Sequence, residues 1–186
     1  LTLQQVLELG LQQHTAGDLL KAEGIYQQIL QSDPNHPEAL HLLGVISHQK
    51  GEGNRAVDLI TKALAIKPNY PEACFNLGYI LRKLGRLDDA VANYRKAVDE
   101  KPDYAEAHNN LGIVLKELGQ LDEAVVSYHK AIDIKLDYAE AHNNLGNVLK
   151  ILGKLERAVA SFHKALAIKP DYAEAHSNLG NVLRIL

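Results

Sequence analysis

A glycine recurs every 34 residues along this 186-residue chain, and no other feature constrains the fold as strongly. The glycines that set the period are Gly10, Gly44, Gly78, Gly112, Gly146 and Gly180. Around them one segment returns almost unchanged, as residues 104–116 (YAEAHNNLGIVLK), 138–150 (YAEAHNNLGNVLK) and 172–184 (YAEAHSNLGNVLR). A fixed period of about 20–50 residues is typical of repeat arrays, in which each unit packs on its neighbours. The chain is therefore expected to be a stack of similar units.

We number each repeat from 1 to 34, so that the recurring glycine is position 8. This predicts a single array over residues 1–186, with repeats at 3–36, 37–70, 71–104, 105–138 and 139–172 and a partial repeat at 173–186.

Each repeat is expected to hold two helices. Apolar residues of the fourth repeat recur at helical spacing from Ala107 to Leu118, which predicts a helix over positions 1–14. Position 15 is glycine in all five complete repeats, and glycine ends a helix readily because it adopts positive φ. A second helix follows, and proline at position 32 ends it in four repeats, whereas the fourth repeat has Leu136 there. Asp103 with Glu106 resembles a capping box for the next first helix. The fold class is therefore all-α.

These residues resemble the tetratricopeptide repeat over essentially the whole chain. The third repeat carries the pattern at Cys74, Leu77, Gly78, Leu81, Ala90, Tyr94, Ala97 and Pro102. The resemblance implies a right-handed α–α superhelical solenoid of helix–turn–helix repeats. Gly24, Gly53 and Leu136 depart from the pattern, so the first two repeats are expected to be the least stable.

Composition excludes several classes of function. The net charge is only −3 and the basic residues are spread through every repeat, so no nucleic-acid partner is expected. No apolar run approaches the ~18 residues of a membrane span, so no membrane partner is expected. Cys74 is the only cysteine, which excludes an internal disulfide and favours a cytoplasmic location. The chain contains no Met, so we expect it to be processed or cut from a longer protein.

Asparagines form a stripe on the first helices at positions 6 and 9. The residues are Asn76, Asn110, Asn144 and Asn178, with Asn147 and Asn181 beside them. Asparagine is a poor helix former, so its recurrence suggests a role. A side-chain amide offers a donor and an acceptor, which match the N–H and C=O of an extended peptide. The alternative is that these amides bond to neighbouring helices or face water.

The asparagine row also resembles the ladder in the repeat domain of O-linked N-acetylglucosamine transferases. That resemblance implies that Asn76, Asn110, Asn144 and Asn178 grip peptide main chain on the concave face. Chaperone-tail-binding tetratricopeptide domains use a clamp of Lys and Arg, but positions 2 and 6 of the last four repeats here hold Glu and Asn. A C-terminal carboxylate is therefore not the expected ligand.

No catalytic or metal-binding pattern is present in the sequence. His108, His142 and His176 recur at position 4, but they lie on helices about 8–10 Å apart, too far for one zinc ion. They are expected to replace the usual aromatic residue, and no metal or cofactor is expected. No phosphate-binding loop or HExxH motif occurs, so we expect no enzymatic activity in this segment.

Three functional hypotheses remain open. The first is a non-catalytic interaction scaffold that binds an extended segment of a protein or peptide partner in a concave groove. The second is the substrate-recruiting portion of a larger glycosyltransferase, with a catalytic domain elsewhere in the full-length protein. The third is a homo-oligomer that stacks through the last helix, where Leu179, Val182, Leu183 and Leu186 form an apolar stripe.

Overall fold

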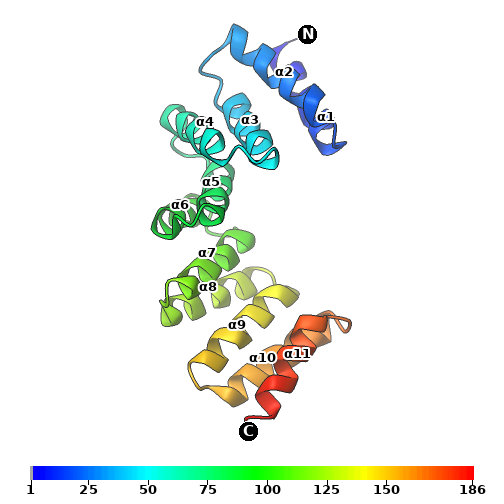
Figure 1. Ribbon diagram of the computed structural model, residues 1–186, viewed down its shortest axis with the longest axis vertical. Coiled ribbons are helices and arrows are strands. Elements are labelled where there is room, and N and C mark those ends of the chain that lie inside the picture. Colours follow the sequence, from blue (N-terminus) through cyan, green and yellow to red (C-terminus); the bar gives the residue numbers. More distant parts are fainter. Residues whose placement is uncertain (1) are drawn as a thin grey trace. The chain divides into compact units, whose positions relative to one another are not determined.

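The computed structural model describes residues 2–186, and these residues form eleven α-helices and no strand (Figure 1). The helices are α1 (Leu3–Thr15), α2 (Leu19–Ser32), α3 (Pro37–Gln49), α4 (Gly53–Ile66), α5 (Pro71–Lys83), α6 (Leu87–Glu100), α7 (Ala105–Glu117), α8 (Leu121–Ile134), α9 (Ala139–Ile151), α10 (Leu155–Ile168) and α11 (Ala173–Leu183). The odd-numbered helices, the first helices of the repeats, begin at the residues predicted to begin each repeat. The predicted all-α fold of helix–turn–helix repeats is confirmed.

The helices group into two compact units, and each is described by itself. Unit 1 ends at Arg86 and contains α1 to α5, and unit 2 begins at Leu87 and contains α6 to α11. In both units a first helix packs along the second helix of its own repeat and against the second helix of the preceding one. First helices also contact each other, α3 with α5 in unit 1 and α7 with α9 and α9 with α11 in unit 2.

Glycine ends the first helices as predicted. The five glycines at position 15 have φ between 73° and 84°, a region that favours glycine over other residues. Proline is not required at the end of the second helix, because α8 ends at Ile134 although Leu136 replaces the usual proline. Leu136 is 77% exposed and packs little of its side chain.

The predicted capping boxes are wrong. The N-cap residues of α7 and α9 are Tyr104 and Tyr138, and neither helix has a side-chain cap. With Tyr104 at the N-cap, Glu106 falls at N2, whereas the box requires the acid at N3. The tyrosine ring instead packs beneath a lysine three residues earlier, with the Lys101 ammonium 4.8 Å from the Tyr104 centroid. A complete capping box is formed at the start of α1, by Thr2 and Gln5.

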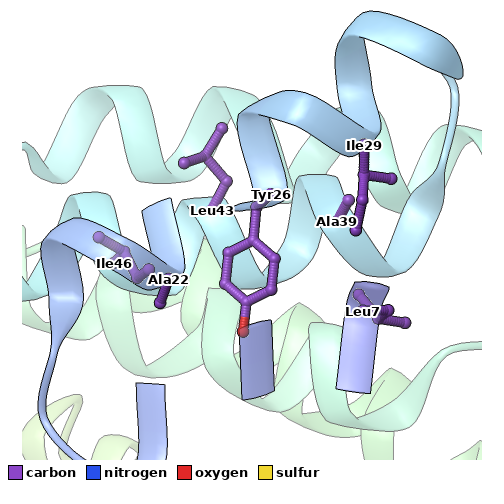
Figure 2. Close-up of a cluster of buried hydrophobic side chains, with 7 residues drawn as sticks. All are labelled: Leu7, Ala22, Tyr26, Ile29, Ala39, Leu43 and Ile46. Atoms are coloured by element: carbon purple, nitrogen blue, oxygen red, sulfur yellow. The ribbon is translucent and has the colours of Figure 1, made fainter. Parts of the chain in front are cut away.

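The core is built where a second helix crosses the glycine of the first. In unit 1 the fully buried Tyr26 of α2 lies over Gly10, and a methyl group on Gly10 would come within 2.5 Å of the ring. Figure 2 shows Tyr26 surrounded by buried apolar residues of α1, α2 and α3. In unit 2, Tyr128 and Phe162 lie over Gly112 and Gly146 in the same way. The recurring glycine therefore sets the distance between paired helices.

Among the described residues, none of the helices combines the length and apolar character needed to cross a bilayer.

Candidate functional site

The predicted asparagine stripe lies on the first helices and is partly accessible. Asn76 is on α5 in unit 1, while Asn110, Asn144 and Asn178 are on α7, α9 and α11 in unit 2. All four side chains are half-buried. We call the surface formed by positions 2, 6, 9 and 13 of the first helices the first-helix face. It is rimmed by exposed glutamates at position 2, namely Glu72, Glu106, Glu140 and Glu174.

Asparagines at position 6 are held by position 5 of the preceding repeat. In unit 2, Asn144 Nδ2 donates to Asn109 Oδ1 at 3.1 Å, and Asn178 Nδ2 donates to Asn143 Oδ1 at 3.0 Å. Both bonds join residues 35 positions apart and therefore link adjacent first helices. Each bond uses a single N–H, which leaves a carbonyl oxygen and a second N–H of each half-buried amide for other partners.

Asn143 is the centre of a larger network at the interface of α9 and α11. Its side chain is completely buried, and its Nδ2 donates to Glu174 Oε1 at 3.0 Å and toward the Tyr172 hydroxyl at 3.5 Å. Burial raises the pKa of Tyr172, and the charges of Glu174 and Glu140 raise it further. The network satisfies a buried amide that would otherwise destabilise the interface. Position 5 is thus a structural position, and it fixes where Asn178 points.

Unit 1 contains the same network with histidine at its centre. His41 Nε2 lies 2.8 Å from Asn76 Nδ2, and His41 Nδ1 lies 2.9 Å from the Tyr70 hydroxyl. Since Asn76 Nδ2 is a donor, Nε2 accepts and the ring is neutral with its proton on Nδ1. Burial lowers the pKa of His41 to about 4, against the opposing charges of Glu72 and Glu38. Burial also raises the pKa of Tyr70 to about 12.

Asn110 is the exception in the stripe. Its Nδ2 donates to the Glu106 carbonyl of its own helix at 2.8 Å. This amide bonds within its own helix, whereas Asn144 and Asn178 bond to the preceding first helix, so the four asparagines are not equivalent.

Position 9 continues the face beside the asparagines. Asn147 is half-buried and forms no protein hydrogen bond among residues 2–186, whereas Asn181 Oδ1 accepts from Arg184 at 2.5 Å. In unit 1 the corresponding residue is Tyr79, which packs edge-on against His48 at 5.6 Å between ring centroids.

A pocket of about 440 Å³ opens on this face in unit 1 between α3 and α5. Asn76 and Tyr79 line it together with Val45, His48, Gln49 and Ile80. A cavity of this size, with an aromatic wall and convergent polar groups, matches the usual form of a ligand site. The structure thus brings one predicted site residue, Asn76, into a pocket.

The histidines at position 4 have a structural role. His108 Nε2 lies 3.1 Å from the Pro102 carbonyl, and His176 Nε2 lies 2.8 Å from the Pro170 carbonyl. Each imidazole thereby satisfies a carbonyl in the turn that precedes its helix. Within residues 2–186, no group of three or more potential metal ligands lies together.

The structure buries only part of the apolar stripe predicted on the last helix. Leu179 and Val182 are buried in unit 2, whereas Leu183 and Leu186 are 54% and 61% exposed. Self-association through this end of the chain stays a prediction.

Sequence reasoning missed the role of position 5. This position holds His41 in unit 1 and Asn109 and Asn143 in unit 2. The available signal was the tandem Asn-Asn in two repeats, combined with the tyrosine at position 34 that ends each of these repeats.

Models of the tetratricopeptide repeat match almost the whole chain. One, described as TPR repeat, matches residues 78–119, 114–150 and 146–183, and the other, described as tetratricopeptide repeat, matches residues 14–73 and 47–92. The chain belongs to the tetratricopeptide repeat family. The finer resemblance to O-linked N-acetylglucosamine transferases stays a prediction. No curated protein sequence matches the chain significantly.

Solved structures of the same fold include MamA, with a TM-score of 0.81 and 29% identity over 89% of this chain and 96% of that one. TTC0263 from Thermus thermophilus, described as a thermophilic TPR protein, has a TM-score of 0.70 and 26% identity over 98% of this chain and 100% of that one. YrrB, described as a TPR protein with an unusual peptide-binding site, has a TM-score of 0.80 and 24% identity over 92% of this chain and 89% of that one. These similarities agree with the repeat fold.

Proposed function

We propose that this protein is an interaction scaffold whose first-helix face binds an extended peptide segment of a partner. The observation that carries the proposal is the arrangement of the position-6 amides. Asn144 and Asn178 are half-buried and each is held by one N–H to the preceding first helix, so that one donor and one acceptor of each amide are left for a ligand. Preorganised amides of this kind lose little conformational entropy when they bind a peptide backbone.

The unit 1 pocket supports the same proposal independently. Asn76 is fixed by His41 and lines the cavity beside the exposed Tyr79. The Lys83 ammonium lies 5.5 Å from the Tyr79 ring centroid and covers part of the ring. An apolar side chain of a bound peptide would fit this aromatic cavity, while Asn76 would bond to its backbone. The repeat family and the peptide-binding site named for YrrB are consistent with this use of the fold.

The test compares two sets of substitutions in peptide binding. Twelve-residue peptides are first selected from a random phage-displayed library on the immobilised wild-type protein. Their dissociation constants are then measured by fluorescence anisotropy for a variant with Asn144 and Asn178 both changed to Ala. The expected loss is about tenfold or more, equivalent to about 1.4 kcal/mol.

The matched control changes Asn109 and Asn143 to Ala. This variant loses the same two inter-helix hydrogen bonds but keeps Asn144 and Asn178 on the face. It should weaken binding less than the first variant, because only the preorganisation of the two amides is lost. Equal weakening in both variants would show that the amides themselves do not contact the peptide, and no weakening in either would place peptide binding on another surface.

A further inference from the structure

A second pocket lies in unit 2 away from the first-helix face, where α8, α9 and α10 meet. Its volume is about 300 Å³, at the small end of the usual range for ligand sites. The buried side chains of Leu145 and Leu149 form part of its lining. Its lining also includes basic side chains, namely His129 from α8 and Arg157 and Lys164 from α10.

The preceding interface of the same unit has no such arrangement of charge. There Arg95 of α6 and Glu123 of α8, at positions 25 and 19 of successive repeats, form an ion pair of 2.7 Å. The same two positions at the α8–α10 interface hold His129 and Arg157. Position 19 thus holds a base instead of an acid, so the corresponding ion pair between α8 and α10 cannot form.

The lining of the pocket is electropositive. Lys164 and Arg157 are opposed by one carboxylate, Asp133. Burial is the main cause that lowers the pKa of His142, and the positive charges of Lys164 and His129 lower it further. His142 therefore experiences the field of these bases, although a hydrogen bond to the Leu136 backbone acts in the opposite direction.

We propose that this pocket is an oxyanion site, which binds the carboxylate or phosphate group of a ligand between Arg157 and Lys164. The apolar part of such a ligand would rest on Leu145 and Leu149. An arginine beside apolar residues is suited to this task, because its planar guanidinium pairs with carboxylate or phosphate through two hydrogen bonds. The site uses none of the asparagines, so it stands independently of peptide binding on the first-helix face.

The experiment uses three probes with one tail, namely hexanoate, hexyl phosphate and hexanol. Binding is followed through the imidazole NMR signals of His142 in the full chain. Both anions are expected to shift these signals, whereas hexanol should bind at least tenfold more weakly. The better of the two anions distinguishes a carboxylate ligand from a phosphate ligand. Equal binding of hexanol would overturn the proposal, because the pocket would then be only an apolar cavity.

Two variants assign the effect to the charges. His129→Arg combined with Arg157→Glu installs at α8–α10 the ion pair that joins α6 to α8, and it should weaken anion binding at least tenfold with unchanged helicity. Lys164→Gln changes only an exposed side chain and should weaken it about threefold or more. Wild-type affinity in both variants would contradict the proposed site. Arg95→Ala, which breaks the natural ion pair elsewhere in unit 2, is the control and should bind the anions normally.

Discussion

Within each unit, adjacent first helices are linked through positions 5, 34 and 6 of the repeats, but the side chains at these positions differ. In unit 1 the central residue is His41, which contacts Tyr70 and Asn76. In unit 2 the central residue of the last interface is Asn143, which contacts Tyr172, Glu174 and Asn178. A neutral imidazole and an amide both offer one donor and one acceptor, so either fills the position. Only the imidazole can take up a proton as the pH falls from 7 toward 4, and the two interfaces should therefore differ in their response to acid.

The units also differ in their ion pairs. Unit 1 contains a partly buried pair between Glu23 of α2 and Lys50, at 3.0 Å, and a pair between Glu38 and Lys67 at 2.6 Å. The Arg95–Glu123 pair of unit 2 is more than half exposed on both sides. Exposed pairs contribute little to stability. The exposed Arg95–Glu123 pair of unit 2 is therefore expected to contribute less to stability than the partly buried Glu23–Lys50 pair of unit 1.

The largest expected effect is the acid sensitivity of unit 1. The pKa of His41 is about 4 in the folded protein and about 6.5 when unfolded, so unfolding takes up a proton between these values. The stability that the neutral His41 side chain provides is fully present above pH 6.5 and is lost as the pH falls toward 4. The change amounts to about 3 kcal/mol. The free energy of unfolding is measured by urea denaturation at pH 7 and pH 4 for the wild type and for His41→Asn. Between these pH values the wild type should lose about 3 kcal/mol more than the variant. Equal losses in both proteins would contradict the buried neutral imidazole.

The second effect concerns the amide network of unit 2. Asn143→Ala removes the acceptor for Asn178 and the donor to Glu174, and it should destabilise the protein by about 1–3 kcal/mol. Urea denaturation at pH 7 measures the change. Asn147→Ala is the control on the same helix, since its half-buried side chain forms no hydrogen bond among the described residues, and it should change stability by less than about 0.5 kcal/mol. An equal effect of the two substitutions would argue against the network.

A smaller, stabilising effect is expected from Gly24→Ala in unit 1. Unit 2 has Val126 and Ala160 at this position of the second helix, and a methyl group on Gly24 would meet no atom within 4 Å. The gain should be up to about 1 kcal/mol, from helix propensity. Thermal denaturation checks it. Gly10→Ala is the matched control, because its methyl group would meet the Tyr26 ring at 2.5 Å, and it should lower the melting temperature.

The smallest effect transfers a residue in the other direction. Leu136→Pro gives α8 the proline that follows α2 and α4 in unit 1, at an exposed turn position. Lys135 already has φ −126° and ψ 94°, close to what a residue before proline requires. The substitution should stabilise unit 2 by about 0.4–1 kcal/mol by restricting the unfolded chain. Hydrogen exchange of α8 and α9 amides would detect slower opening, and faster exchange than in Leu136→Ala would refute the expectation.

The sequence by itself determined the repeats and their helices. Glycine at position 15, the apolar spacing from Ala107 to Leu118 and the 34-residue period are local or periodic signals, and they predicted where the first helices begin. They failed at the helix start, where Tyr104 rather than Asp103 is the N-cap, because the tyrosine packs beneath Lys101.

Only the tertiary structure decided which atoms of the asparagine stripe are engaged. Asn144 and Asn178 bond across 35 residues, whereas Asn110 bonds to its own helix. The pocket beside Arg157 likewise depends on which charges meet across two second helices. Such pairings join residues that are distant along the chain, so the identity of each residue does not specify its partner until neighbouring repeats are packed together.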